Sequence, residues 1–115
     1  MSSFDSETFP QLMDTVERFI RQRLMPLERQ VEEKEEVPAE VIEEMKEMGL
    51  FGLGIPEAYG GCELDLMQEL QVQMAFSYTS PAFRLVFWPN VGIGSKGLVL
   101  AGTEEQKQKY LPGLA

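Results

Sequence analysis

The stretch from Gly49 to Gly61 constrains the fold of this chain more than any other part of its sequence. It contains five glycines and one proline, and it lies between two segments with helical periodicity. A helix interior does not hold so many glycines, because each costs about 1 kcal/mol relative to alanine. The same stretch carries four large apolar residues, Leu50, Phe51, Leu53 and Ile55. The sequence therefore predicts a helix that ends at Gly49, followed by an irregular segment held in a core by its side chains.

Apolar residues recur at steps of three and four through most of the remaining chain, which is typical of amphipathic helices. Pro26 is predicted to start a new helix, and Pro89 is predicted to kink or end one near Leu85 to Trp88. Thr103 and Gln106 match a capping box. Besides the helix that starts at Pro26, the expected helices cover residues 9–24, 38–48, 66–78, 82–88, 94–100 and 104–111. The chain is thus predicted to be a single all-α domain, residues 1–115, built as a bundle of five to six helices.

Two of these helices carry predictions about burial. The helix over residues 66–78 is apolar on both sides and is expected to be central. One of its sides carries Leu66, Met67, Leu70 and Met74. The helix over residues 94–100 is expected to carry its apolar side chains into the core, namely Leu98, Val99 and Leu100.

Charge and cysteine content limit the possible partners and the location of the protein. The net charge of −9 argues against nucleic acid and against anionic membrane surfaces. The most apolar window, from Leu85 to Ala101, is interrupted by polar residues and falls short of the roughly 20 residues that span a bilayer. Cys62 is the only cysteine, which fits a reducing compartment. No secretory signal is visible, so a soluble, cytoplasmic protein is expected.

No self-sufficient catalytic group of residues is recognisable. The chain lacks histidine, so the common triads and the glutamate–histidine di-metal motif cannot be built. Nine glutamates between Glu28 and Glu47 are best explained as a solvated helix face. Cys62 has no basic neighbour in sequence and is expected to be a structural bystander. No catalytic, cofactor-binding or metal-binding residue is therefore predicted.

Two phrases of the sequence resemble the N-terminal helical domain of the flavin-dependent acyl-CoA dehydrogenases. The first is the helix ending in Gly49-Leu50 and continuing to Pro56-Glu57-Ala58-Tyr59-Gly60-Gly61. The second runs from Gly102 to Pro112 and reads GTEEQKQKYLP. The two phrases occur in the order and at about the separation that the family shows, and the resemblance covers about residues 7–115.

The resemblance implies an FAD-dependent oxidoreductase of fatty acid metabolism that acts on acyl-CoA thioesters and passes electrons to an electron-transfer flavoprotein. In the family a glutamate from the C-terminal half removes the α-proton while the flavin takes hydride from the β-carbon. The β-domain and the C-terminal helical domain lie beyond the residues present here. The 115 residues alone are therefore expected to bind no FAD and to be inactive.

The resemblance also implies that this domain forms one wall of the acyl pocket and packs against the C-terminal helices. By alignment back from Gly102, the positions that line this pocket are Leu85, Val86, Trp88, Pro89 and Ile93. The alternative is that Phe87 and Trp88 are simply core aromatics. The density of aromatic residues predicts an exposed apolar face around Phe83 to Ile93, through which the chain could self-associate.

Two other functions are compatible with the sequence. The chain could be an acidic helical module that binds a partner protein and takes no part in flavin chemistry, as its glutamate-rich segment would suit. It could also be the first domain of a related flavin oxidase or monooxygenase, which this domain alone does not distinguish from a dehydrogenase.

Overall fold

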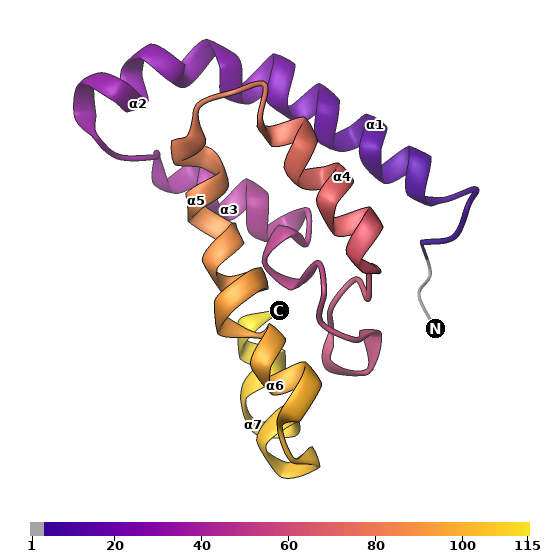
Figure 1. Ribbon diagram of the computed structural model, residues 1–115. Coiled ribbons are helices and arrows are strands. Elements are labelled where there is room, and N and C mark those ends of the chain that lie inside the picture. The colour runs from indigo at the N-terminus through magenta and orange to yellow at the C-terminus, as the bar shows by residue number, and fades with distance from the viewer. Residues whose placement is uncertain (1–3) are drawn as a thin grey trace.

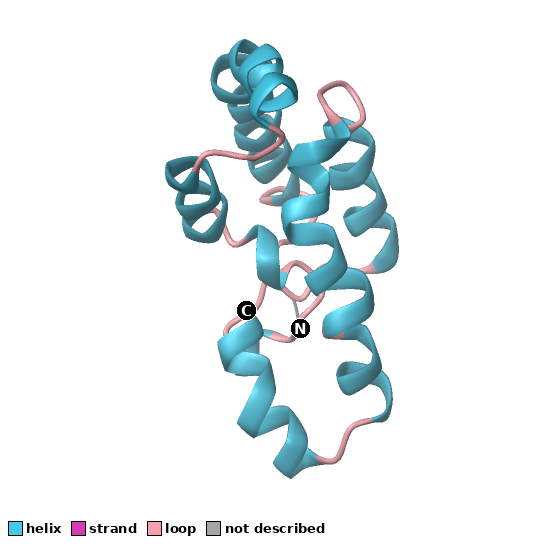
Figure 2. Cartoon of the chain, turned by 90° about the vertical axis from the view of Figure 1, so that its left-hand side faces the viewer, coloured by secondary structure: helices cyan, strands magenta, loops and turns pink. Residues whose placement is uncertain are grey.

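Helices α1 and α2 form one long helical run along an edge of the molecule, in a computed structural model that describes residues 4–115 (Figure 1). The residues described include seven α-helices and no strand, which confirms the all-α prediction (Figure 2). Short π-helical and 3-10 turns join several of them. The α-helices are α1 (Phe9–Phe19), α2 (Glu28–Lys34), α3 (Ala39–Glu47), α4 (Leu66–Phe76), α5 (Pro81–Pro89), α6 (Lys96–Ala101) and α7 (Glu104–Leu114).

The chain stays helical at Pro26, where the sequence predicts a new start. A π-helical turn, Ile20–Leu24, follows α1 directly, and a 3-10 turn, Met25–Leu27, leads into α2. Proline lacks an N–H group and its ring clashes with the carbonyl four residues back in a regular helix. Local changes of helical pitch are a common way to accommodate that clash. The predicted start agrees with this change of helix type, because Pro26 lies in the first turn of the 3-10 segment that leads into α2, although the chain stays helical throughout.

The glycine-rich stretch adopts the irregular path that the sequence predicts. Gly49 has a φ of 81°, the left-handed conformation that glycine adopts without cost, and it ends the turn after α3. Leu50, Leu53 and Ile55 are fully buried. Three backbone hydrogen bonds then tie the returning chain to this segment, among them Leu64 N–H to the Leu53 carbonyl at 2.8 Å. The stretch is therefore part of the core.

The core is a contiguous apolar cluster to which α1 to α5 contribute, whereas the buried Leu111 of α7 lies outside it. Phe76 and Phe87 meet edge to face inside it, with ring centroids 4.8 Å apart. Among the largest fully buried side chains are Val16, Leu24, Val41, Met45, Phe76, Phe83, Phe87 and Leu111.

Helix α4 begins at a capping box and buries one side. Asp65 accepts a hydrogen bond from the Gln68 N–H at 2.8 Å, and the Gln68 side chain accepts one from the Asp65 N–H at 3.0 Å. The buried side carries Glu69, Val72, Ala75 and Phe76. The opposite side is apolar but exposed, which corrects the expectation of a helix buried all round. We call it the α4 stripe, and it consists of Leu66, Met67, Leu70, Met74 and Tyr78.

Helices α6 and α7 project from the bundle as a hairpin (Figures 1 and 2). Helix α6 buries none of its residues: Leu98 and Val99 are half-buried and Leu100 is 78% exposed. The prediction that these three side chains enter the core is therefore wrong. The predicted capping box of Thr103 and Gln106 is confirmed.

Helix α7 continues beyond its predicted end at Leu111. It reaches Leu114, with Pro112 and Gly113 inside it, and the Ala115 N–H bonds to the Leu111 carbonyl at 2.9 Å. Proline and glycine lower helix stability without forbidding it, and the burial of Leu111 anchors this last part of α7. None of the helices between residues 4 and 115 has the length and hydropathy that crossing a bilayer requires.

Candidate functional site

Helix α5 carries most of the positions predicted to line the acyl pocket. Ser80 caps it by accepting a hydrogen bond from the Ala82 N–H at 3.3 Å, and Pro81 occupies its first position. The α-helix ends at Pro89, one residue beyond the range of Leu85 to Trp88 in which a kink or an end is predicted. Pro89 keeps helical dihedral angles, with φ −58° and ψ −34°, and a π-helical turn, Asn90–Gly94, continues toward α6. The wider turn accommodates the proline without interrupting the helical path.

The five predicted pocket positions divide between surface and core. Leu85, Pro89 and Ile93 are exposed, with Leu85 at 58% and Ile93 at 85%. Val86 and Trp88 are half-buried and pack against the core. Residues four apart on a helix follow one side, so the three exposed residues form a row along the outer face of this run. Such a row can form part of a wall once another surface lies opposite.

The aromatic residues behind this row belong to the core. Phe83 and Phe87 are fully buried, so the exposed apolar face predicted around residues 83–93 contains only part of that segment. Trp88 retains partial exposure. For Phe87, the structure supports the alternative of a core aromatic.

Asn90 attaches the π-helical turn to two other parts of the molecule. Its side-chain amide donates hydrogen bonds to the Phe51 carbonyl at 2.8 Å and to the Leu114 carbonyl at 2.7 Å. Sequence reasoning missed this residue, because a single asparagine between a proline and a valine resembles an ordinary loop residue. Its bonds join the glycine-rich stretch, the π-helical turn and the end of α7.

Glu69 and Lys96 form an ion pair that the sequence analysis also missed. The Lys96 Nζ lies 3.0 and 3.1 Å from the two Glu69 carboxylate oxygens. The Glu69 side chain is completely buried, whereas the Lys96 side chain is 34% exposed. One signal was present in the sequence: Glu69 is the only charged residue between Leu66 and Tyr78. A lone charge in such a helix requires a partner if it is buried.

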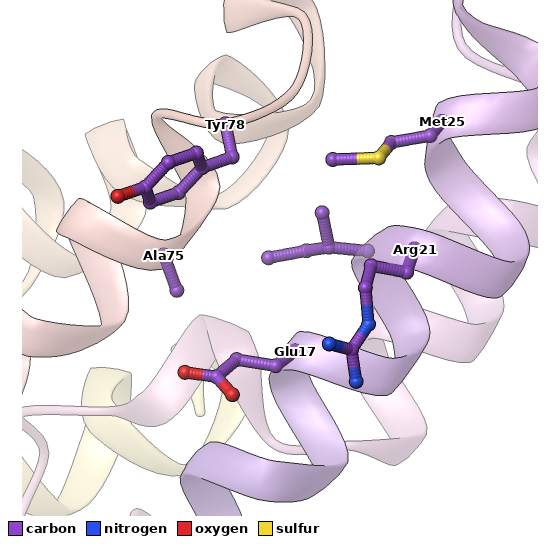
Figure 3. A pocket seen from close by; sticks show the side chains of 6 residues that line it. Glu17, Arg21, Met25, Ala75 and Tyr78 are labelled. Carbon is purple, nitrogen blue, oxygen red and sulfur yellow. The ribbon is translucent and has the colours of Figure 1, made fainter.

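Three well-defined cavities of the described residues can be compared with the predicted pocket positions, and none of the three gathers them. The first, of about 350 Å³, lies between the α1 run and the end of α4. Its side chains point toward one another from these two helices (Figure 3). It is lined by Glu17, Ile20, Arg21, Met25, Ala75 and Tyr78.

The other two cavities lie at opposite ends of the α1–α2 run. One, of about 430 Å³, is lined by residues of α1 together with Phe4 and Met48. The other, of about 350 Å³, includes Leu85, the only predicted pocket position in any of the three. It has an apolar floor that includes Val31 and Val37, and its rim carries Glu32, Glu35 and Glu36.

Among residues 4–115, the one cysteine is not an activated nucleophile. Burial raises the pKa of the Cys62 thiol, and the charge of Glu57 raises this pKa further. The thiol donates a weak hydrogen bond to the Gly49 carbonyl at 3.6 Å. Both effects favour the neutral thiol, as expected for a structural residue. Residues 4–115 contain no group of three or more side chains suited to hold a metal ion.

Comparison with known proteins identifies the family. The model of the acyl-CoA dehydrogenase N-terminal domain matches residues 6–115. This chain belongs to the acyl-CoA dehydrogenase family. A probable acyl-CoA dehydrogenase of Bacillus subtilis (strain 168) is 39% identical over 102 residues, which is 88% of this chain and 17% of that protein. A second acyl-CoA dehydrogenase of the same organism is 32% identical over 100 residues, or 87% of this chain and 26% of that protein.

Solved structures agree with the family assignment. An acyl-CoA dehydrogenase from Bacillus anthracis, complexed with FAD, matches all of this chain and 20% of that chain, with a TM-score of 0.79 and 34% identity. A structure described as the electron transferring flavoprotein of Acidaminococcus fermentans has a TM-score of 0.84 and 28% identity, and the match covers 100% of this chain and 30% of that chain. This chain thus spans between a sixth and a third of the length of these relatives.

Proposed function

We propose that these residues form the N-terminal helical domain of an FAD-dependent enzyme that introduces a double bond between the α and β carbons of an acyl-CoA thioester. The observation that carries this proposal is the match of the family model to residues 6–115, over a fold that aligns with an FAD-complexed relative. The proposed partners are the acyl-CoA substrate and an electron-transfer flavoprotein. Fatty acid metabolism and a cytoplasmic location belong to the same proposal, the location being supported by the single cysteine.

The contribution of this domain is binding and packing. Leu85, Pro89 and Ile93 are proposed to face the acyl chain, with Val86 and Trp88 supporting them from the core side. The row that these three residues form is apolar and exposed, which supports such a role. The α4 stripe is proposed to pack against further helices of the enzyme. Neither surface includes a carboxylate that could remove the α-proton, so these residues alone are expected to be inactive.

The residues present do not fit an FAD site. Cofactor pockets commonly measure about 300–1,000 Å³, and the three cavities here lie at the small end of that range. A dinucleotide also needs groups that hold its two phosphates, and Arg21 is the only positively charged residue lining any of the three. We therefore propose that other parts of the enzyme hold FAD.

The test is a spectroscopic titration of the protein that carries this sequence, purified from its natural source. We expect flavin absorbance that bleaches when acyl-CoA thioesters of different lengths are added without oxygen, and recovers when an electron-transfer flavoprotein is added. Recovery with oxygen alone would instead indicate a flavin oxidase or monooxygenase. A protein with no flavin and no oxidation of any acyl-CoA would overturn the proposal.

One observation favours a second function. The cavity beside α2 combines an apolar floor with Glu32, Glu35 and Glu36 at its rim. Within the described part of the chain, none of these carboxylates forms an ion pair. An acidic protein-interaction module would use such a surface. This second function predicts that the purified protein contains no flavin and is recovered together with a basic partner protein in a stoichiometric amount.

A further inference from the structure

Helix α6 lacks the apolar anchors that hold the other helices in place. None of its residues is buried, although it directly continues the run of α5 and the π-helical turn. The Val99 N–H donates to the Ser95 carbonyl, and the Ser95 hydroxyl donates to the Val91 carbonyl, so both bonds lie within the same helical run. Hydrophobic burial is the usual reason that a helix keeps its place in a protein. Because α6 has only half-buried apolar side chains, a polar interaction can contribute strongly to its orientation relative to α4.

The Glu69–Lys96 pair is the interaction that joins these two helices. Lys96 is the first residue of α6, and Glu69 lies on the buried side of α4. Both carboxylate oxygens are within 3.1 Å of the lysine Nζ. A buried carboxylate that lost its cation would be unpaired in a medium of low polarity, so the geometry of this pair tolerates little change.

Gly54 shows how tightly the glycine-rich stretch encloses the pair. A Cβ atom at this position would stand 2.0 Å from the Glu69 Oε1 and 3.2 Å from the Lys96 Nζ. Any residue other than glycine would displace the ion pair or the backbone beside it. Three segments far apart in sequence thus meet at these two charges: the glycine-rich stretch, α4 and α6.

We propose that Glu69 and Lys96 are positioning residues, and that their ion pair sets where α6 and the π-helical turn stand relative to α4. The pair acts on the α6 side of the turn, whereas Asn90 and the buried Val91 hold the turn against the rest of the molecule. Through the turn it influences the place of Ile93 on the outer face and the packing of Trp88 behind it. Its effect on acyl-CoA binding rests on the proposed function above. Its effect on the position of the turn does not.

Trp88 offers a direct reporter, because it is the only tryptophan of the chain. Its indole lies 3.5–3.6 Å from the place that a Cβ at Gly92 would take, so it packs on the π-helical turn. The first experiment compares the acrylamide quenching of Trp88 fluorescence in the 115-residue protein and in Glu69→Gln and Lys96→Met. A π-helical turn released by local opening is expected to raise the quenching constant about two-fold in both variants.

The control is a second ion pair, between Arg23 and Glu44, which joins the α1 run to α3 and is more exposed than the Glu69–Lys96 pair. The Arg23 Nε lies 3.0 Å from both carboxylate oxygens. Arg23→Gln removes an ion pair between helices away from α6 and is expected to leave the quenching of Trp88 unchanged. If Arg23→Gln raised the quenching as much as Glu69→Gln, the effect would be general loosening and the proposal would be wrong.

A double variant separates the effect of the ion pair on the position of the turn from the effect of packing. Glu69→Met with Lys96→Met removes both charges, and apolar replacement of a buried ion pair often preserves stability. We expect this variant to unfold at a urea concentration near that of the parent while Trp88 remains more accessible to acrylamide. Wild-type quenching in the double variant would show that packing alone positions the turn.

Steady-state kinetics test the effect of the ion pair on acyl-CoA binding. In the flavin-loaded protein, Glu69→Gln is expected to raise the KM for acyl-CoA about ten-fold, with kcat changed less than about two-fold, since a displaced wall weakens ground-state and transition-state binding alike. A ten-fold fall in kcat with an unchanged KM would contradict the positioning role. If no flavin activity exists, the Trp88 measurements still decide the structural proposal, because they need no substrate.

Discussion

At Gly61 a single missing side chain decides the path of the backbone. A Cβ atom there would stand 2.1 Å from the Ile55 carbonyl oxygen and 2.6 Å from its carbon. These are backbone atoms, so the conflict cannot be relieved by turning a side chain. Gly61 therefore permits the close approach of two chain segments.

We therefore expect Gly61→Ala to lower the free energy of unfolding by about 2 kcal/mol or more, because the backbone must separate. The matched control is Gly97→Ala in α6, where no atom lies within 4 Å of an added Cβ. That change is expected to stabilise the protein by up to about 1 kcal/mol through helix propensity. Urea unfolding followed by circular dichroism measures both. Equal stability of the Gly61 variant and the parent would show that the close approach is not required.

At the scale of a single helix, α4 shows why periodicity did not select the buried face. Both sides are rich in apolar side chains, and the only charge, on Glu69, lies on the buried side. A pattern that is apolar all round gives no preferred direction. The α4 stripe is exposed because α1 and α5 pack against the other side, and those contacts lie outside the sequence of the helix itself.

This exposure predicts that lysines on the α4 stripe are tolerated. Leu70→Lys with Met74→Lys is expected to change the free energy of unfolding by less than about 1 kcal/mol, because both side chains already lie at the surface. The same variant should bind less hydrophobic dye and scatter less light, since charges replace an exposed apolar patch that favours self-association. Val72→Lys is the control on the buried side, and it is expected to unfold the protein. Unfolding by the double change would show that the stripe is buried.

At the scale of the whole molecule, Tyr59 and Glu104 connect the glycine-rich stretch to α7. The Tyr59 hydroxyl donates to the Glu104 carboxylate at 2.6 Å across 45 residues of sequence. This bond lowers the pKa of Glu104 and raises the pKa of Tyr59. Both groups are accessible to solvent, so the bond acts as a pH-dependent link at the surface.

The sign of the pH dependence follows from these two shifts. The lowered pKa of Glu104 means that its contribution is present above the ordinary carboxyl range and is lost as the pH falls below about 4. The raised pKa of Tyr59 means that its contribution is present below the ordinary phenol range and is lost above about pH 10. We expect the wild type to exceed Tyr59→Phe in stability between these limits and to match it outside them.

Urea unfolding of both proteins at acidic, neutral and alkaline pH measures this difference. NMR titration should also show the pKa of Glu104 returning upward toward its ordinary value in Tyr59→Phe. A difference between the two proteins that is the same at every pH would indicate that the phenol contributes through packing alone.

Local signals allowed much of the fold to be predicted from sequence. The end of the helix at Gly49, the capping box of Thr103 and Gln106, and the all-α class all depend on neighbouring residues within a turn or two. The family could be recognised for the same reason, because its phrases are short and contiguous. Backbone conformation and capping depend on residues within a few positions of each other, so they can be predicted from the sequence alone.

Tertiary structure decided what depends on distant partners. Burial of Glu69 requires Lys96, and Gly54 leaves the space that the pair occupies. Helicity through Pro26 and Pro89 requires packing that outweighs the lost hydrogen bond. The exposed row of Leu85, Pro89 and Ile93 is likewise set by which side of α5 meets the core. Burial is a free energy shared among segments far apart in the chain, so no single stretch of sequence determines it.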